Sequence, residues 1–217
     1  MSFPNVFKYW NSRTCKDNSR EKNDDASIGT AIVHSLRDWQ AMGKHITVLV
    51  VGSNACNDES FTRLDLSGYK QLKDVRIGSF CFNGVNVVKI VGLDELERLE
   101  VGTESFKRHD EGREGRAFVL KDCKALRRMI VGFRSFHDFS VCEISNLPSL
   151  VLLTIGDLIK ESHNFYYANL RLESECANDG SQQDLPKLTH ITIGALAFHD
   201  CSEVVFRSGC GIAVMIG

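Results

Sequence analysis

Short segments of alternating apolar and polar residues recur along most of this chain at nearly constant spacing. Six of them end in Ile-Gly or Val-Gly, with the glycines at Gly52, Gly78, Gly102, Gly132, Gly156 and Gly194. Their spacings of 26, 24, 30, 24 and 38 residues fit a 24-residue unit with insertions of 2, 0, 6, 0 and 14 residues. Alternation with a period of two is typical of strands that bury one side. The pattern therefore predicts about six units built around short strands.

The apolar positions keep the same phase in every unit. Before the later glycines the chain follows L-x-x-L-x-x-L-x-[IV]-G, and a second alternating apolar pair in each unit predicts a second strand. Four residues after the glycine, four units carry a phenylalanine, at Phe82, Phe106, Phe136 and Phe198. We expect these side chains to face inward, with the phenylalanine filling a bend. The glycine is expected to allow either a positive φ or a close approach of two chain segments.

The fifth unit departs from this pattern, because Lys160 stands four residues after its glycine. Phe165, Tyr166 and Tyr167 follow, and we expect one of them to fill the bend that lacks its phenylalanine, with exposure as a binding anchor as the alternative. Most of this unit's insertion lies in residues 174–183, a second candidate for recognition because long loops on rigid scaffolds often bind partners.

A single unit of this size cannot bury its own apolar side chains, so stacked neighbours have to supply the burial. The stretch Ile193–Cys201 reads I-G-A-L-A-F-H-D-C and matches the I-G-x-x-A-F-x-x-C pattern of BspA-like leucine-rich repeats. Residues 46–206 therefore resemble the leucine-rich-repeat superfamily, BspA-like subclass. The resemblance implies an α/β or mainly β leucine-rich-repeat solenoid of about six 24-residue units. It also implies a protein-interaction or adhesion module and not an enzyme.

The beginning of the chain lacks the repeat. Residues 1–28 include a polar stretch of mixed charge, so we expect a flexible N-terminal arm. Residues 29–45 predict a capping helix over the first strand, with Thr30 or Ser27 as N-cap and Gly43 beyond its end. The arm also holds an apolar cluster, expected to dock on the solenoid end or to serve as a short motif for a partner: Phe3, Val6, Phe7, Tyr9 and Trp10.

The solenoid itself is predicted over residues 46–217. Its last stretch, 209–217, is apolar and predicts a seventh strand, which would leave a sheet edge open to pairing with another chain. Self-association through this edge, in a structural or assembly role, is the alternative to a protein-binding function.

Composition narrows the classes of function. The chain has 217 residues, with 26 basic and 28 acidic side chains and a net charge of −2, which argues against a nucleic-acid binder. No apolar run reaches the length of a membrane span, and no secretory leader is visible, so we expect a cytoplasmic protein more than a secreted or cell-surface one. The eight cysteines form no CxxC pair, and we expect reduced, buried thiols.

The outward positions of the strands before the glycines predict a binding face, since this sheet lines the concave side in leucine-rich repeats. Arg98 and Arg128 lie near its centre, and Ile130 and Leu152 are expected to form an exposed apolar patch. The alternative is a solvated charge ladder, with Asp74 paired to Arg98. The full candidate set for a protein partner is Asp74, Arg76, Arg98, Glu100, Arg128, Ile130, Leu152, Thr154 and His190.

Catalytic and metal-binding patterns are weak. His137-Asp138 and His199-Asp200 recur at one phase, but other units hold unrelated polar pairs there, so a polar turn is the simpler interpretation. His199, Cys201 and Cys176 lack the spacing of a zinc site. Gly112 and Gly115 lack the spacing of a nucleotide-binding loop. We predict no enzyme activity, no catalytic residue, no metal and no cofactor.

Overall fold

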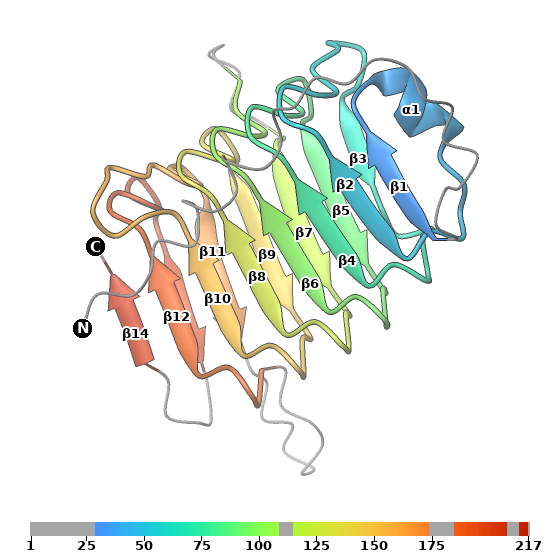
Figure 1. Ribbon diagram of the computed structural model, residues 1–217. Helices are drawn as coiled ribbons and strands as arrows, with labels where there is room; N and C mark the ends of the chain where they lie inside the picture. Colours follow the sequence, from blue (N-terminus) through green and yellow to red (C-terminus); the bar gives the residue numbers. More distant parts are fainter. Residues whose placement is uncertain (1–28, 109–114, 174–184, 208–212, 217) are drawn as a thin grey trace.

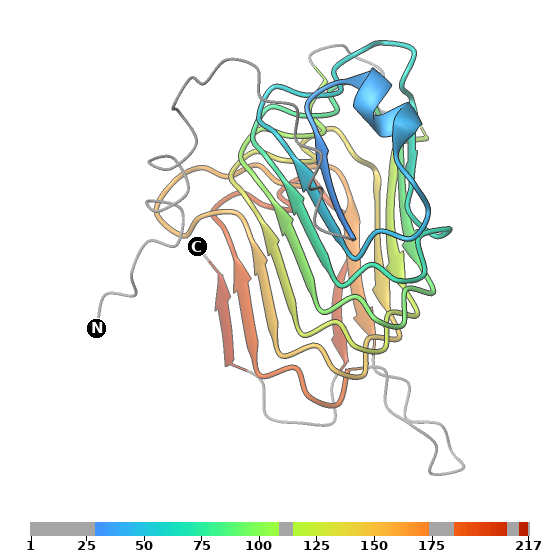
Figure 2. The same ribbon diagram turned by 45° about the vertical axis from the view of Figure 1, so that its right-hand side comes forward.

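Two parallel β-sheets face each other, and the chain passes from one to the other in successive coils (Figures 1 and 2). The computed structural model describes residues 29–108, 115–173, 185–207 and 213–216. The eight-stranded sheet has, in spatial order, β1 (Thr30–Val33), β2 (Val48–Val51), β4 (Asp74–Ile77), β6 (Arg98–Val101), β8 (Arg128–Val131), β10 (Leu152–Ile155), β12 (His190–Ile193) and β14 (Ala213–Ile216). The six-stranded sheet has β3 (Arg63–Asp65), β5 (Val87–Val91), β7 (Ala117–Lys121), β9 (Val141–Ser145), β11 (Asn169–Glu173) and β13 (Val204–Arg207).

Every strand pairs with its neighbours in parallel, and the register keeps equivalent positions of the repeat side by side. One inward row of the eight-stranded sheet runs through Val75, Leu99, Met129, Leu153 and Ile191. The insertions between units therefore leave the strands in phase. The predicted two strands per unit are confirmed, and so are their inward sides for the described side chains other than Val204.

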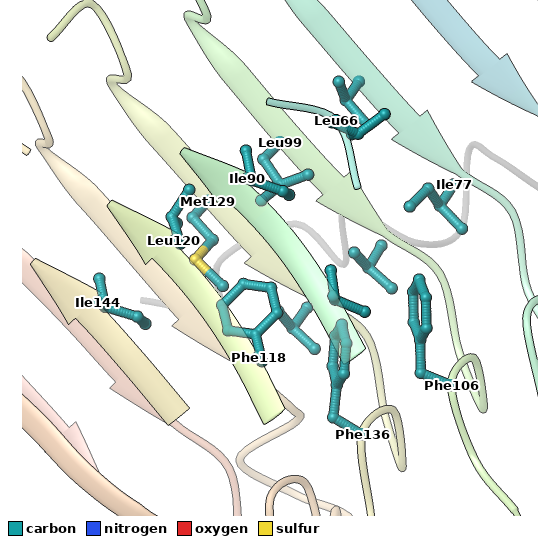
Figure 3. Packing of buried hydrophobic residues seen from close by; sticks show 14 of the residues in the cluster. Leu66, Ile77, Ile90, Leu99, Phe106, Phe118, Leu120, Met129, Phe136 and Ile144 are labelled. Carbon is teal, nitrogen blue, oxygen red and sulfur yellow. The ribbon is translucent and has the colours of Figure 1, made fainter. Parts of the chain in front are cut away.

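The space between the sheets is filled by the apolar residues that the repeat predicted (Figure 3). Leu99, Met129 and Phe118 are all fully buried there. One expected inward residue differs, because Val204 is 42% exposed. It lies on β13, the last strand of its sheet among the described residues, so it lacks a neighbouring strand on one side.

The bend phenylalanines form a continuous stack from coil to coil. Ring centroids of Phe106 and Phe136 lie 4.5 Å apart with an interplanar angle of 6°, and Figure 3 shows these two rings side by side. The stack extends to Phe82 on one side, at 5.1 Å from Phe106. On the other side it continues to Phe165 at 4.8 Å from Phe136, and then to Phe198 at 5.5 Å.

Phe165 thus occupies the place in the fifth unit that spacing had given to Lys160. It follows Gly156 by nine residues and not by four, so residues 157–161 form an excursion that the other bends lack. Phe165 is fully buried, which confirms that one of the three aromatic residues fills this bend.

The repeated glycines serve close approach between coils. A Cβ added to Gly102 would lie 2.6 Å from the carbonyl carbon of Gly78, and one added to Gly132 would lie 2.6 Å from that of Gly102. None of these three glycines has a positive φ; among the repeated ones only Gly156 does, at +81°. Successive coils therefore lie too close together at these glycines to leave room for a side chain there.

The predicted capping helix over residues 29–45 is wrong in its first half. Residues 30–33 form β1, whose parallel pairing with β2 satisfies their backbone groups and buries Val33. The helix α1 (Leu36–Ala41) has six residues, and its N-cap is Ser35, whose Oγ accepts a hydrogen bond from the Asp38 N–H at 3.3 Å, so neither Thr30 nor Ser27 caps it. Its C-cap is Met42, so Gly43 lies just beyond its end, as predicted.

The helix still closes the first end of the core. Trp39 of α1 lies 5.5 Å from Phe61 and 5.9 Å from Phe82, measured between ring centroids. The buried Cys56 stands at the phenylalanine position of the first coil, so this coil supplies no ring at that position. The predicted arm over residues 1–28 lies outside the described residues.

At the other end, residues 213–216 form β14, which pairs in parallel with β12. This confirms the seventh strand that was predicted within residues 209–217.

Replacing Gly102 by alanine should destabilise the protein by about 1–3 kcal/mol, because the added methyl group meets the backbone of the preceding coil. Gly43→Ala is the matched control, since nothing lies within 4 Å of a Cβ at that position. Urea unfolding followed by circular dichroism measures both variants. Equal midpoints for the two would show that close glycine packing does not limit stability.

Candidate interaction surface

The nine predicted site residues lie on five adjacent strands of the eight-stranded sheet, β4 to β12. One outward row runs through Asp74, Arg98, Arg128, Leu152 and His190. The neighbouring row holds Arg76, Glu100, Ile130 and Thr154. The structure thus brings the predicted residues onto one face, because the strand register places equivalent repeat positions side by side. We name these nine residues the sheet face.

Two carboxylates pair with three arginines on the sheet face. Asp74 accepts hydrogen bonds from Arg76, with Nη2–Oδ2 at 2.6 Å and Nε–Oδ1 at 3.1 Å. Asp74 also pairs across the strands with Arg98 at 3.4 Å, which confirms the predicted cross-strand pair. Glu100 pairs with Arg128 at 3.7 Å. The hydrogen bond to Asp74 raises the pKa of the Arg76 guanidinium.

The predicted exposed apolar patch is only partly present. Ile130 is 6% exposed, so the expectation that it offers an accessible aliphatic surface is wrong. Its cross-strand neighbours Glu100 and Thr154 flank it, and the Glu100–Arg128 pair lies beside it. Leu152 is half-buried and remains the accessible aliphatic residue of this set.

The excursion at residues 157–161 presents an apolar tip that the sequence had not singled out. Ile159 is 94% exposed and Leu158 is 38% exposed. The excursion follows β10, a strand of the sheet face, after Gly156. The sequence did contain a signal for this tip. Two aliphatic residues stand directly after Ile155-Gly156-Asp157, where other units place the bend. The predicted recognition loop at residues 174–183 lies outside the described residues.

The two His-Asp pairs share one contact. The rings of His137 and His199 come from different bends, and both stack against the ring of Tyr166. Their centroids lie 5.6 Å and 5.0 Å from the Tyr166 centroid. His137 Nδ1 lies 2.6 Å from Asp138 Oδ1, and the buried guanidinium of Arg116 lies 3.4 Å from Asp138 Oδ2. This arrangement links neighbouring bends and supports the interpretation as a polar turn. Within the described ranges, no group of three or more His, Cys, Asp or Glu side chains is placed to hold a metal ion.

The described cysteines are free thiols placed in or beside the core. Cys81, Cys123 and Cys142 are buried to 3% exposure or less, and Cys201 is partly exposed. Burial raises the pKa of Cys123 from 9.0 to about 11, and burial likewise raises the pKa of Cys81 and Cys142. At neutral pH these thiols stay protonated and are poor nucleophiles.

A scan against protein-family models, a search of curated proteins and a search of solved structures found no match to this chain. None of the described residues belongs to a helix with the length and apolar character that crossing a membrane requires.

Iodoacetamide at pH 8 should modify Cys201 of the native protein and leave Cys81, Cys123 and Cys142 unmodified until denaturant is added. Peptide mapping by mass spectrometry reads each site. Rapid native labelling of Cys123 at pH 8 would contradict its burial.

Because burial raises the pKa of Cys123, the contribution of this thiol to the free energy of unfolding is complete below about pH 9. It is lost as the pH rises towards 11.

Proposed function

We propose that this chain is a BspA-like leucine-rich-repeat solenoid that binds a protein partner, without catalysis, through its sheet face. The observation that carries the proposal is the alignment of Arg76, Arg98 and Arg128 on adjacent parallel strands of one outward face. The two parallel sheets and the I-G-x-x-A-F-x-x-C pattern support the repeat class. We further propose a cytoplasmic location.

The sheet face suits a macromolecular partner because it is broad and held by the sheet. In the part of the chain that the structure describes, the one helix lies beside β1 and none covers β4 to β12 (Figure 1). A flat array of this kind, with arginines and Leu152, has the composition of protein contacts more than that of a small-molecule pocket.

The ion pairs of the face do not compete strongly with such a partner. The Arg98 side chain is 45% exposed and that of Arg128 is 37% exposed. The carboxylates are less accessible, at 16% for Asp74 and 24% for Glu100, so a partner's carboxylate would meet the arginines on their exposed side without replacing Asp74 or Glu100. Arginine is also among the residues that most often dominate binding energy. The charge ladder and the binding face are therefore compatible.

The double variant Arg98→Glu/Arg128→Glu should weaken binding of a captured and purified partner by about a hundredfold, because two guanidinium contacts become repulsive. The partner is found by affinity capture and mass spectrometry from the source cell, and its affinity is then measured by calorimetry. Lys89→Glu is the matched control, since Lys89 points outward from β5 on the other sheet.

Circular dichroism checks that both variants keep the fold. Unchanged affinity in the folded double variant would remove the sheet face from the proposal.

A second candidate function is assembly through the last strand. Within the described residues β14 pairs with β12 on one side and with no strand on the other, so its outer edge offers backbone groups to another chain. Met215 on this strand is 41% exposed.

Assembly through β14 predicts that the sedimentation coefficient of the purified chain increases with concentration in the micromolar range. Analytical ultracentrifugation over a concentration series measures this. A monomer that persists across the series would exclude the assembly function.

A further inference from the structure

The excursion between β10 and Phe165 holds an apolar tip in a defined conformation. The side chain of Ile159 is almost fully exposed, yet its N–H donates to Asp157 Oδ1 at 2.8 Å. Ser162, which is fully buried, fixes the base of the excursion. Its Oγ accepts from the Asp157 N–H at 2.6 Å, and its single O–H is shared between the carbonyl oxygens of Asp157 and Lys160, at 3.0 and 3.1 Å. The exposure of Ile159 is therefore built into the local hydrogen bonding.

Two cations flank an aromatic ring next to this tip. The guanidinium carbon of Arg134 lies 4.9 Å from the ring centroid of Phe133, and the Lys160 Nζ lies 5.8 Å from the same ring. Phe133 is partly exposed and belongs to the preceding bend, whose Arg134 N–H donates to the Ser162 carbonyl oxygen at 2.9 Å. Lys160 thus links the Phe133 ring to the aliphatic residues that precede it in the excursion.

The two cations of this surface are not paired with the two carboxylates of the excursion, Asp157 and Glu161. The side chains of Arg134 and Lys160 take part in no ion pair with the residues that the structure describes, whereas Glu161 lies 3.5 Å from His163 Nε2. Asp157 Oδ1 accepts a hydrogen bond from the Ile159 N–H. Two available cations beside an apolar tip favour a partner that supplies a carboxylate and an apolar side chain together.

We propose that Phe133, Arg134, Leu158, Ile159 and Lys160, here named the tip surface, bind an acidic polypeptide segment. Ile159 inserts into an apolar hollow of the partner, and partner carboxylates pair with the Arg134 guanidinium and the Lys160 ammonium group. This inference rests on the proposed function and deepens it, because the tip surface continues from β10 of the sheet face and names the chemistry of the bound segment.

A polypeptide fits this surface better than a membrane does. Lipid anchoring needs a large apolar area or two independent signals, and two aliphatic side chains with two cations supply a marginal amount of each. A protein partner instead needs only a pocket for one anchor side chain, and arginine is among the residues enriched where binding energy concentrates.

The test uses the full chain to select binders from a phage library of random peptides. The expected result is enrichment of peptides in which Asp or Glu stands next to Leu, Ile or Phe. A synthetic peptide from the enriched set should bind Ile159→Asp and Arg134→Glu/Lys160→Glu at least about tenfold more weakly than the original protein, measured by fluorescence anisotropy. Ile32→Asp is the matched control, because Ile32 is 62% exposed but lies on β1 at the other end of the sheet.

The other outcomes overturn the proposal, provided that circular dichroism shows folded variants. No enriched peptide, enrichment without acidic residues, or equal affinity for the tip variants each contradicts it. If Arg98→Glu/Arg128→Glu abolishes peptide binding and the tip variants do not, the sheet-face function stands and the tip-surface inference fails. A membrane would be identified as the partner if the protein sediments with phosphatidylserine–phosphatidylcholine vesicles, Ile159→Asp does not, and no peptide binds. This result would also overturn the proposal.

Discussion

The close contact of glycine backbones between successive bends is the constraint on which the rest of the structure depends. Gly78, Gly102 and Gly132 stack so closely that a Cβ on the second or third would meet the backbone of the glycine before it. This separation lets the strands before each glycine pair in parallel and in register. It also brings the bend phenylalanines within stacking distance of each other. A larger residue at one glycine would push two coils apart and would disturb both sheets at once.

The bends are strained locally and are stabilised only by their neighbours. Phe82, Phe106, Phe136 and Phe198 have φ between +57° and +59°, and Phe165 has +48°. The left-handed region costs roughly 1–2 kcal/mol for a residue with a side chain. Complete burial of each ring against the next one offsets this cost, since aromatic side chains carry large apolar areas. A unit without neighbours would keep the strain and lose the burial, so stability is expected to be shared along the stack.

The sequence predicted most of the fold because its apolar residues recur in phase with the glycines. Period-two alternation identified the inward side of strands such as β6 and β9, and repeat spacing identified their neighbours. Residues 30–33 were different, since Ile32 and Val33 fit a helical spacing with Leu36 and Trp39 as well as a strand. Pairing with β2 decided between the two, and that pairing is a tertiary contact that local spacing does not contain. Lys160 was misplaced for a related reason, because spacing gives the size of an insertion and not its position.

The candidate surfaces were predicted to different degrees. Strand register follows from the repeat, so the rows through Arg98 and Arg128 could be read from the sequence. The burial of Ile130 could not, because strand register alone does not determine how far an outward side chain is covered. The exposed tip at Ile159 depends on how Ser162 holds the excursion, which is a matter of hydrogen bonding between residues that no repeat relates.

The stacking of coils in register is tested most directly by NMR contacts between aromatic rings. In a sample with differently labelled Phe106 and Phe136, the 4.5 Å separation of the ring centroids predicts strong nuclear Overhauser cross-peaks between their ring protons. Such cross-peaks between residues thirty positions apart in the sequence would place consecutive bends directly on each other. Their absence in the folded protein would contradict the stacked coils and, with them, both proposed surfaces.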